Sequence, residues 1–338
     1  MTAAPAVSRT SARGTLAAPP RRKPRVGFGD LVALTVRQHR LAIGLSMLGY
    51  VLFGLLIVLS RGHVAFGYWW TFDPKVFTPV PACLIAVFLG APLLAGEYER
   101  QTNLLVWSQD VTPPRWLFAK LTVLGGLVVV LATLLAIVVN TQAPNGYGGA
   151  NYGAFNPLAV FYVGGYETWL PLSLAYAVFG FLLGAAVGGL ARRTVAAIGI
   201  TLVGFVVIRF VIANVLWPWL LAHLIAPIRV TWPMADWITP NPNSPTGAGP
   251  QDYVLNSQLW LTASGQSVDS PPACDSVQGI KPIGDCLMTH GIATSGEDFQ
   301  PLSRLPLFQS VELAIYVVLI AICLVITIWS VRRKASIR

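Results

Sequence analysis

Few side chains in this sequence have chemistry of their own, and most of these lie far apart along the chain. Its four histidines stand at positions 39, 63, 223 and 290, and its four cysteines at 83, 274, 286 and 323. Only Cys274, Cys286 and His290 lie near one another in the sequence. They could hold zinc, although structural zinc sites usually have four ligands. The sequence favours a disulfide between Cys274 and Cys286, which the oxidising outer face of a membrane would allow.

Motifs for catalysis and nucleotide binding are missing from the sequence. There is no G-x-x-x-x-G-K-[ST] phosphate loop, no G-x-S-x-G and no H-E-x-x-H. A membrane enzyme would need acids, bases or metal ligands that converge at one depth in the membrane. An ion-coupled carrier would need several ionisable groups buried within its spans. The apolar segments hold almost none. The sequence therefore predicts a protein without a catalytic residue, metal or cofactor of its own.

Arg209 is the one basic residue that falls inside a long apolar segment. An arginine at the centre of a membrane helix costs about 2.5–3.5 kcal/mol on insertion scales, and such groups usually face the bundle and find a partner. Glu312, near the start of the last apolar segment, is the predicted partner, and Glu167 is the alternative. In a third interpretation Arg209 reaches lipid phosphate and Glu312 reaches water.

The elements that must position these residues are membrane helices. Of the 338 residues, 54% are hydrophobic and 11% are charged, whereas soluble domains average about 25% charged residues. A span needs about 20 apolar residues. Six segments qualify, and they predict an all-α polytopic membrane fold: 41–60, 79–96, 117–139, 169–190, 195–216 and 311–331.

The distribution of lysine and arginine predicts the orientation of the spans. Eight of them lie in residues 1–40, three in 96–120, two in 191–194 and four after the last span, whereas the alternate segments carry two, none and three. Both termini are therefore expected in the cytoplasm. The net charge of +9 reflects this asymmetry, and it does not indicate nucleic-acid binding.

The remaining segments have weaker patterns. We expect a disordered basic tail at residues 1–28 and a short interfacial helix at 29–40. We expect a loop-rich outer cap at 217–309, and its first part, 217–228, is expected to be interfacial or re-entrant. Gly180, Gly184 and Gly188 form a stripe that lets helices pack closely. The stripe is expected to pack within the chain, with a subunit interface as the alternative.

The segment "GEYERQTNLLVWSQDVTPPRW" (96–116) places a cluster of charges between two apolar runs. As a helix over 97–111, it would put Leu104 and Trp107 on one apolar stripe and Glu97 and Glu99 in its first turn, where the helix dipole favours anions. The pattern predicts an amphipathic helix along the inner membrane surface. A plain solvated loop is the alternative.

In this segment, acidic residues are followed by Thr, Leu, an Arg-Trp pair and Lys, and this order resembles the pattern of ABC-2-type transporter permeases. The likeness extends to residues 34–40, 191–209 and 299–316. Many such permeases have glycine directly before the position of Thr102, where this sequence has Gln101, and this leaves the local backbone open. The resemblance implies a coupling helix that docks on a separate ATPase. The residues it assigns to that role are Glu97, Glu99, Arg100, Thr102, Leu104, Trp107 and Arg115.

The resemblance also implies the function. It predicts the permease subunit of an ABC exporter in the bacterial plasma membrane, which moves an amphipathic or apolar substrate outward by alternating access. ATP would be bound by the partner ATPase subunit, and a second permease copy would complete a homodimer or heterodimer within the lipid bilayer. The alternative, from a different class, is a polytopic membrane enzyme or sensor that acts through the 217–309 cap.

Overall fold

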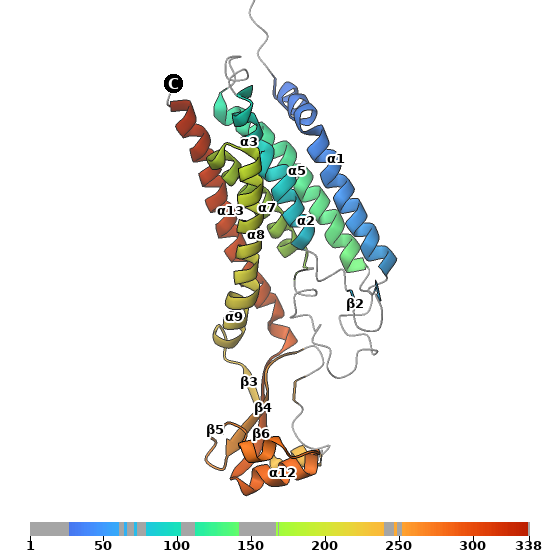
Figure 1. Cartoon of the computed structure of the whole chain (residues 1–338), viewed down its shortest axis with the longest axis vertical. Coiled ribbons are helices and arrows are strands. Elements are labelled where there is room, and N and C mark those ends of the chain that lie inside the picture. Colours follow the sequence, from blue (N-terminus) through green and yellow to red (C-terminus); the bar gives the residue numbers. More distant parts are fainter. Residues whose placement is uncertain are drawn as a thin grey trace, which may run out of the picture.

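The computed structural model describes residues 27–60, 64–65, 71–72, 79–102, 112–141, 167, 169–239, 247–248 and 252–336. Six apolar helical spans form one bundle, and a small cap that contains a β-sheet lies beyond one of its ends (Figure 1). Each span has at least 21 residues, which suffices to cross about 30 Å of hydrocarbon. The expected all-α polytopic membrane fold is confirmed.

The spans follow one another along the chain. The first is α1 (Phe28–Ser60), and the second joins α2 (Pro79–Leu84), η2 (Ile85–Gly90) and α3 (Ala91–Glu99). The third is α5 (Pro113–Thr141) and the fourth is α7 (Leu170–Ala191). The fifth joins α8 (Thr194–Val211), η3 (Ile212–Leu216) and α9 (Trp217–His223). The 3-10 turn η4 (Leu302–Arg304) precedes the sixth, α13 (Leu305–Ser336). The end where α1 begins and α13 ends is called the terminal end (Figure 1).

Two spans contain a π-helical turn, η2 and η3, and each turn is followed closely by a proline, Pro92 or Pro218. Proline has no N–H to donate to the preceding turn, and a π-helical turn accommodates such a break. The fifth span therefore continues as a helix through His223, and the expectation of a separate interfacial segment is wrong for residues 217–223. Residues 29–40 likewise belong to the continuous helix α1.

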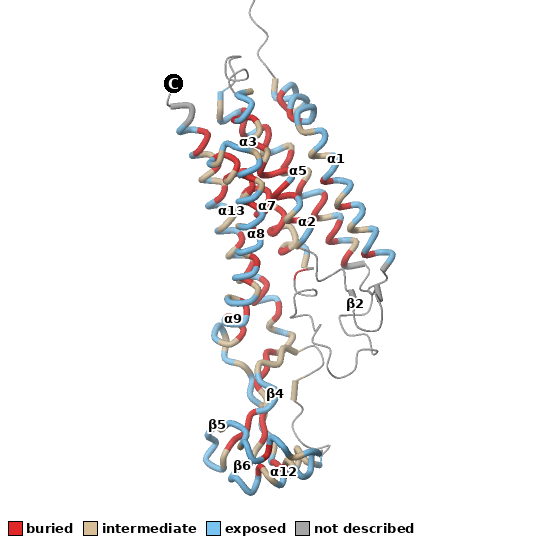
Figure 2. The backbone as a smooth tube through the Cα atoms, in the orientation of Figure 1, coloured by how far each residue is buried: buried red, intermediate tan, exposed pale blue. Residues whose placement is uncertain are grey.

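The fourth span, α7, is the core of the bundle and packs against α3, η2, α5, α8 and α13. Its glycine stripe faces the second span, because a Cβ on Gly180 would lie 2.8 Å from the carbonyl oxygen of Ala82. A Cβ on Gly184 or Gly188 would overlap the backbone of the same span. The stripe thus packs within the chain. Buried residues concentrate along α7 and its neighbours, and exposed residues lie on the outside of the spans (Figure 2). Many of these exposed residues are large and apolar.

The cap, defined as residues 228–300, contains a four-stranded antiparallel sheet in the order β3-β6-β4-β5. Its strands are β3 (Ile228–Pro233), β4 (Tyr253–Thr262), β5 (Ser267–Val268) and β6 (Ile292–Gln300), and its helices are α10 (Met234–Ile238), α11 (Pro272–Asp275) and α12 (Ile280–Thr289). A short strand pair, β1 (Val64–Ala65) and β2 (Thr71–Phe72), follows α1. The expectation of a cap with little regular structure is wrong.

Candidate functional site

The charged segment after the second span begins differently from the sequence expectation. Glu97 and Glu99 lie in the last turn of α3, which is continuous with the second span, and not in the first turn of a separate helix. Arg100 and Arg115 are exposed and Thr102 is partly buried at the terminal end. Leu104 and Trp107 lie outside the described residues. The structure therefore ends α3 at Glu99, within the segment where the sequence predicted a helix start.

Glu97 points into the bundle, where it forms a buried ion pair with Lys120 of α5. The ammonium of Lys120 also lies 3.3 Å from His39 Nε2 of α1, and 4.8 Å from the ring centre of Trp116. Because an unpaired buried charge costs several kcal/mol, this cluster ties α1, α3 and α5 together just below the terminal end. Glu97 is 6% exposed, so its expected role as a surface docking residue is corrected: its contact is with Lys120.

Gln101 has a left-handed backbone with φ of 56°, directly after the C-cap residue Arg100. Glycine is the usual residue at this position after a helix, because a side chain is strained there. Gln101 stands where many similar permeases have glycine, and this difference left the local backbone open. The structure shows that the backbone is left-handed at this position. The chain keeps the glycine-like conformation with a side chain that disfavours it.

Glu99 makes a contact that sequence reasoning missed. Its Oε2 accepts a hydrogen bond of 2.9 Å from the backbone N–H of Thr194, the first residue of α8. The first N–H groups of a helix have no partner within it, and a carboxylate at this end is favoured by the helix dipole. The end of the second span thus caps the start of the fifth.

Arg209 lies within the bundle and is 8% exposed. It forms ion pairs with both acids that the sequence analysis named: Nη2 donates to Glu167, and Nη1 lies 3.3 Å from Glu312 Oε1. The structure therefore brings the predicted partner and the alternative partner to one guanidinium. The interpretation in which Arg209 reaches lipid phosphate does not describe this geometry.

Two tyrosines that sequence reasoning missed complete this cluster. Tyr176 of α7 donates a 2.8 Å hydrogen bond to Glu312, and its ring centre lies 4.3 Å from the guanidinium carbon of Arg209. Tyr316 accepts a 2.9 Å hydrogen bond from Arg209 and packs edge-on against Tyr176. One signal was available, since Glu312 and Tyr316 are four residues apart and share a helix face. The cluster joins the fourth, fifth and sixth spans.

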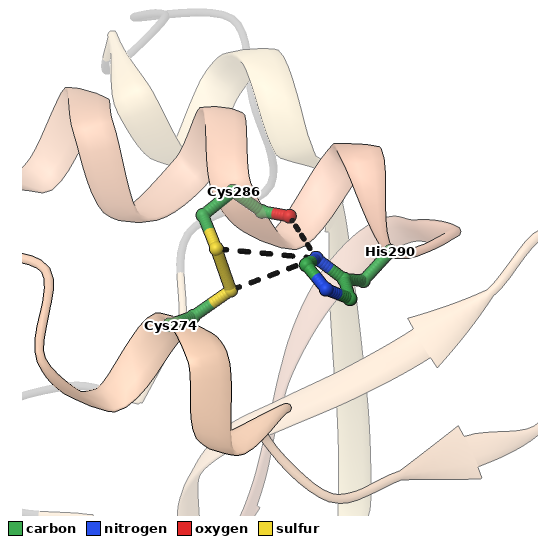
Figure 3. A group of neighbouring side chains, drawn as sticks. All are labelled: Cys274, Cys286 and His290. Atoms are coloured by element: carbon green, nitrogen blue, oxygen red, sulfur yellow. Dashed lines mark hydrogen bonds between the residues drawn. A yellow bond between two sulfur atoms is a disulfide. The ribbon is translucent and has the colours of Figure 1, made fainter.

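In the cap, Cys274 of α11 and Cys286 of α12 are joined by a disulfide (Figure 3). His290 lies beside it, with Nδ1 at 3.9 Å from each sulfur and 2.9 Å from the backbone carbonyl oxygen of Cys286. A zinc site would need these sulfurs as separate thiolates. With both sulfurs in the disulfide, the arrangement does not provide that set of ligands.

Polar side chains also attach the cap to the bundle. Gln300, at the end of β6, donates hydrogen bonds of 2.8 Å to the carbonyls of Leu221, in the last turn of the fifth span, and Ile225, just after it. Arg229 makes two 2.8 Å hydrogen bonds with Asp298 across β3 and β6. These bonds, with the nearby charge of Asp298, raise the pKa of the Arg229 guanidinium.

The bundle holds a cavity between α1, α2, α5 and α7, lined by Tyr50, Ser173 and Tyr176 among others. Its volume of ≈ 20 Å³ accommodates about one water molecule. Pockets for organic ligands measure about 300–1,000 Å³. This cavity is therefore not a substrate site.

Comparison with known proteins gives a family match for part of the chain. Residues 67–217 match the family model described as "ABC-2 membrane transporter related". No curated protein and no solved structure matches the chain. The matched residues include the second, third and fourth spans, the charged segment after the second span, and most of the fifth span. The chain is thus a multi-pass membrane protein with six spans, and its residues 67–217 match the ABC-2 membrane transporter related family, which supports an ABC-2-type permease.

Proposed function

We propose that the chain is the membrane subunit of an ABC exporter, and that a separate ATPase subunit docks at its terminal end. The observation that carries this proposal is the structure around the segment between the second and third spans. That segment lies within the matched residues. The buried ion pair between Glu97 and Lys120 joins the helices on either side of it, α3 and α5. It offers exposed Glu99 and Arg100 at the end of α3 and exposed Arg115 at the start of α5.

The Glu97–Lys120 pair supports a mechanical role for this region. The pair and His39 connect the last turn of α3 to α1 and α5, so a partner that pushes on residues 99–102 would move three helices together. The ATPase would bind and hydrolyse ATP, and the permease would supply no phosphate loop of its own. Its part is to convert the movement of the partner into alternating access.

A substrate path between two copies of the chain fits the packing of the bundle. The core around α7 is filled by close helix contacts, and the cavity described above holds about one water molecule. We therefore place the path of an amphipathic or apolar substrate at the interface with a second permease copy, in a homodimer or a heterodimer. The exposed apolar faces of the spans supply surface for both lipid and partner.

The charge distribution supports the orientation of this assembly. At the terminal end, exposed arginines lie on α1, directly after α3, on α5, in the α7–α8 turn and on α13. By the positive-inside rule this end faces the cytoplasm, where an ATPase can reach it, in a bacterial plasma membrane. The disulfide in the cap fits the opposite, oxidising side.

The test is to purify the tagged full chain from native membranes in lipid nanodiscs. We expect a polypeptide with a phosphate loop to be recovered in stoichiometric amount and to hydrolyse ATP in the complex. A chain that is recovered intact without any such polypeptide would contradict the proposal. That result would favour the alternative, a membrane enzyme or sensor that acts through the cap.

A further inference from the structure

Two carboxylates share one guanidinium on the cap side of the bundle, which is the half away from the terminal end. Glu167 stands just before α7 and Glu312 lies early in α13, and both pair with Arg209 of α8. When all three side chains are ionised, they carry one excess negative charge between them. All three are buried, and two carboxylates that share a buried site favour a proton on one of them. This arrangement is therefore suited to binding a proton.

The two acids differ in how well their oxygens are satisfied. Glu312 Oε1 accepts a 2.8 Å hydrogen bond from Tyr176 and a 3.3 Å hydrogen bond from Arg209. Glu167 Oε1 accepts from Arg209 as well, but Glu167 Oε2 is buried and has no hydrogen-bond partner in the described part of the chain. Hydrogen bonds favour the ionised form of a buried carboxylate, and a buried oxygen without them disfavours it. Glu167 is therefore the acid that takes the proton.

The charges around Glu167 act on it in opposite directions. The ionisable side chains that face it from the described elements are those of Arg209 in α8, Tyr176 in α7, and Glu312 and Tyr316 in α13. Burial raises the pKa of the Glu167 carboxyl to about 7, Arg209 opposes this rise, and the negative charge of Glu312 adds to it. Glu167 therefore gains or loses its charge close to neutral pH.

Space for water lies beside this group of side chains. Ser173 donates a 2.8 Å hydrogen bond to the backbone carbonyl of Glu167, and Tyr176 donates to Glu312. Ser173 and Tyr176 also line the cavity described above, which accommodates about one water molecule. The residues that hold the two acids thus border a space through which a proton can approach them.

We propose that Glu167 is a proton-binding site on the cap side, and that its proton controls the link between the fourth and fifth spans. The proton adds to the carboxylate of Glu167 and neutralises it, and no other bond forms or breaks. With Glu167 ionised, its ion pair with Arg209 ties the start of the fourth span to the fifth span. With Glu167 protonated, Arg209 keeps its ion pair with Glu312 alone. Acid on the cap side therefore loosens the fourth span and leaves the fifth and sixth joined.

The test follows the proton on the full chain in lipid nanodiscs. Infrared difference spectra are recorded between about pH 8 and about pH 6, where ordinary Asp and Glu carboxyls stay ionised. We expect the band of a protonated carboxyl to appear as the pH falls. Glu167→Gln should abolish this band, and Glu312→Gln should move it to lower pH, because Arg209 then has one carboxylate to neutralise. Asp285→Asn is the matched control, since Asp285 is an exposed acid on α12, and it should keep the band.

Thermal stability over a wider pH range gives an independent measurement. Because the pKa of Glu167 is raised in the folded chain, the folded chain holds a proton that the unfolded chain has already released, from the ordinary pKa of glutamate up to about pH 7. Stability should therefore fall as the pH rises through this window and level off above it. Glu167→Gln should remove the fall, because glutamine resembles the protonated acid, and Asp285→Asn should retain it.

Three results would overturn the inference. The first is the absence of a carboxyl band in the wild type over this range, a result that does not depend on the folding of any variant. The second is a band that persists in Glu167→Gln and disappears in Glu312→Gln, which would place the proton on Glu312. The third is a fall in stability with rising pH that Glu167→Gln retains. None of these measurements involves the ATPase, so the proposed function is tested separately.

Discussion

Arg209 shows how one charge inside the membrane constrains its neighbours. Its guanidinium pairs with Glu167 before the fourth span and Glu312 in the sixth, while Tyr176 and Tyr316 line its sides. Charge counting in the sequence was enough to name both acids, since few others lie near a span. It could not choose between them, because the distance between spans is set by helix packing. The tyrosines gave a weaker signal, as aromatic residues fill many membrane helices.

Removal of Arg209 should therefore harm the protein more than removal of either acid. Arg209→Leu leaves two buried carboxylates without their cation, whereas Glu312→Gln leaves the pair with Glu167. Breaking a buried pair from one side costs about 3–5 kcal/mol, so Arg209→Leu should lower thermal stability in detergent the most. Arg332→Leu, at an exposed position, is the control. Equal and additive effects of Arg209→Leu and Glu312→Gln would show that the residues do not act together.

At the scale of elements, the packing of α7 on the second span depends on glycine. A Cβ at position 184 would overlap backbone atoms of Ala86 and Ala91, whereas a Cβ on Gly199 of α8 meets nothing within 4 Å. Gly184→Ala should thus lower the unfolding free energy by about 1–3 kcal/mol. Gly199→Ala should raise it by about 0.5–1 kcal/mol. Thermal unfolding of both variants in one detergent tests this, and equal effects would contradict the packing.

The end of α3 offers a second test at this scale. Gln101→Gly should stabilise the protein by about 1 kcal/mol, because glycine adopts the left-handed conformation without strain. Gln101→Ala should give little change, since alanine retains the strain. Thermal stability is the measurement. A loss of stability with glycine would mean that the glutamine side chain makes a contact that offsets the strain of its backbone.

The disulfide of the cap gives a third test. It links α11 to α12, and closing a loop of this size stabilises by about 3 kcal/mol in the chain-entropy account. Cys274→Ser should therefore make the cap more sensitive to protease, whereas Cys83→Ser should not. Mass mapping of unreduced wild-type protein should find Cys274 and Cys286 in one cross-linked pair. Free thiols at both positions together with retained zinc would support the metal site instead.

The cap sheet could not be predicted from the sequence, and the reason is physical. Strand β6 buries Ser295, Asp298 and Gln300, so its polar residues do not alternate with apolar ones as in a simple half-buried strand. Asp298 is buried because Arg229 pairs with it, and Gln300 because it caps the fifth span. These partners lie far from β6 in the sequence, so the sequence of the strand alone does not reveal them. The spans, in contrast, were predictable because about 20 apolar residues in a row are a local signal.

At the scale of the whole molecule, the two ends of the bundle differ in the residues that they carry. The terminal end carries exposed arginines, among them Arg100 and Arg115, and the cap at the opposite end carries the disulfide (Figure 1). Between them, buried charge clusters join α1 to α3 and α5 near one end, and the fourth, fifth and sixth spans further along. An ATPase at the terminal end would thus act on helices that are linked to one another through the bundle.

The most direct test of this account locates the ATPase on the permease. A photo-crosslinking amino acid is placed at Arg100, which is exposed at the terminal end, or at Lys281, which is exposed in the cap. Each full-length variant is irradiated in native membranes, and the cross-linked partners are identified by mass spectrometry. The account predicts a phosphate-loop ATPase cross-linked at position 100 and absent at position 281. An ATPase trapped at position 281, or none at position 100 in an intact chain, would contradict it.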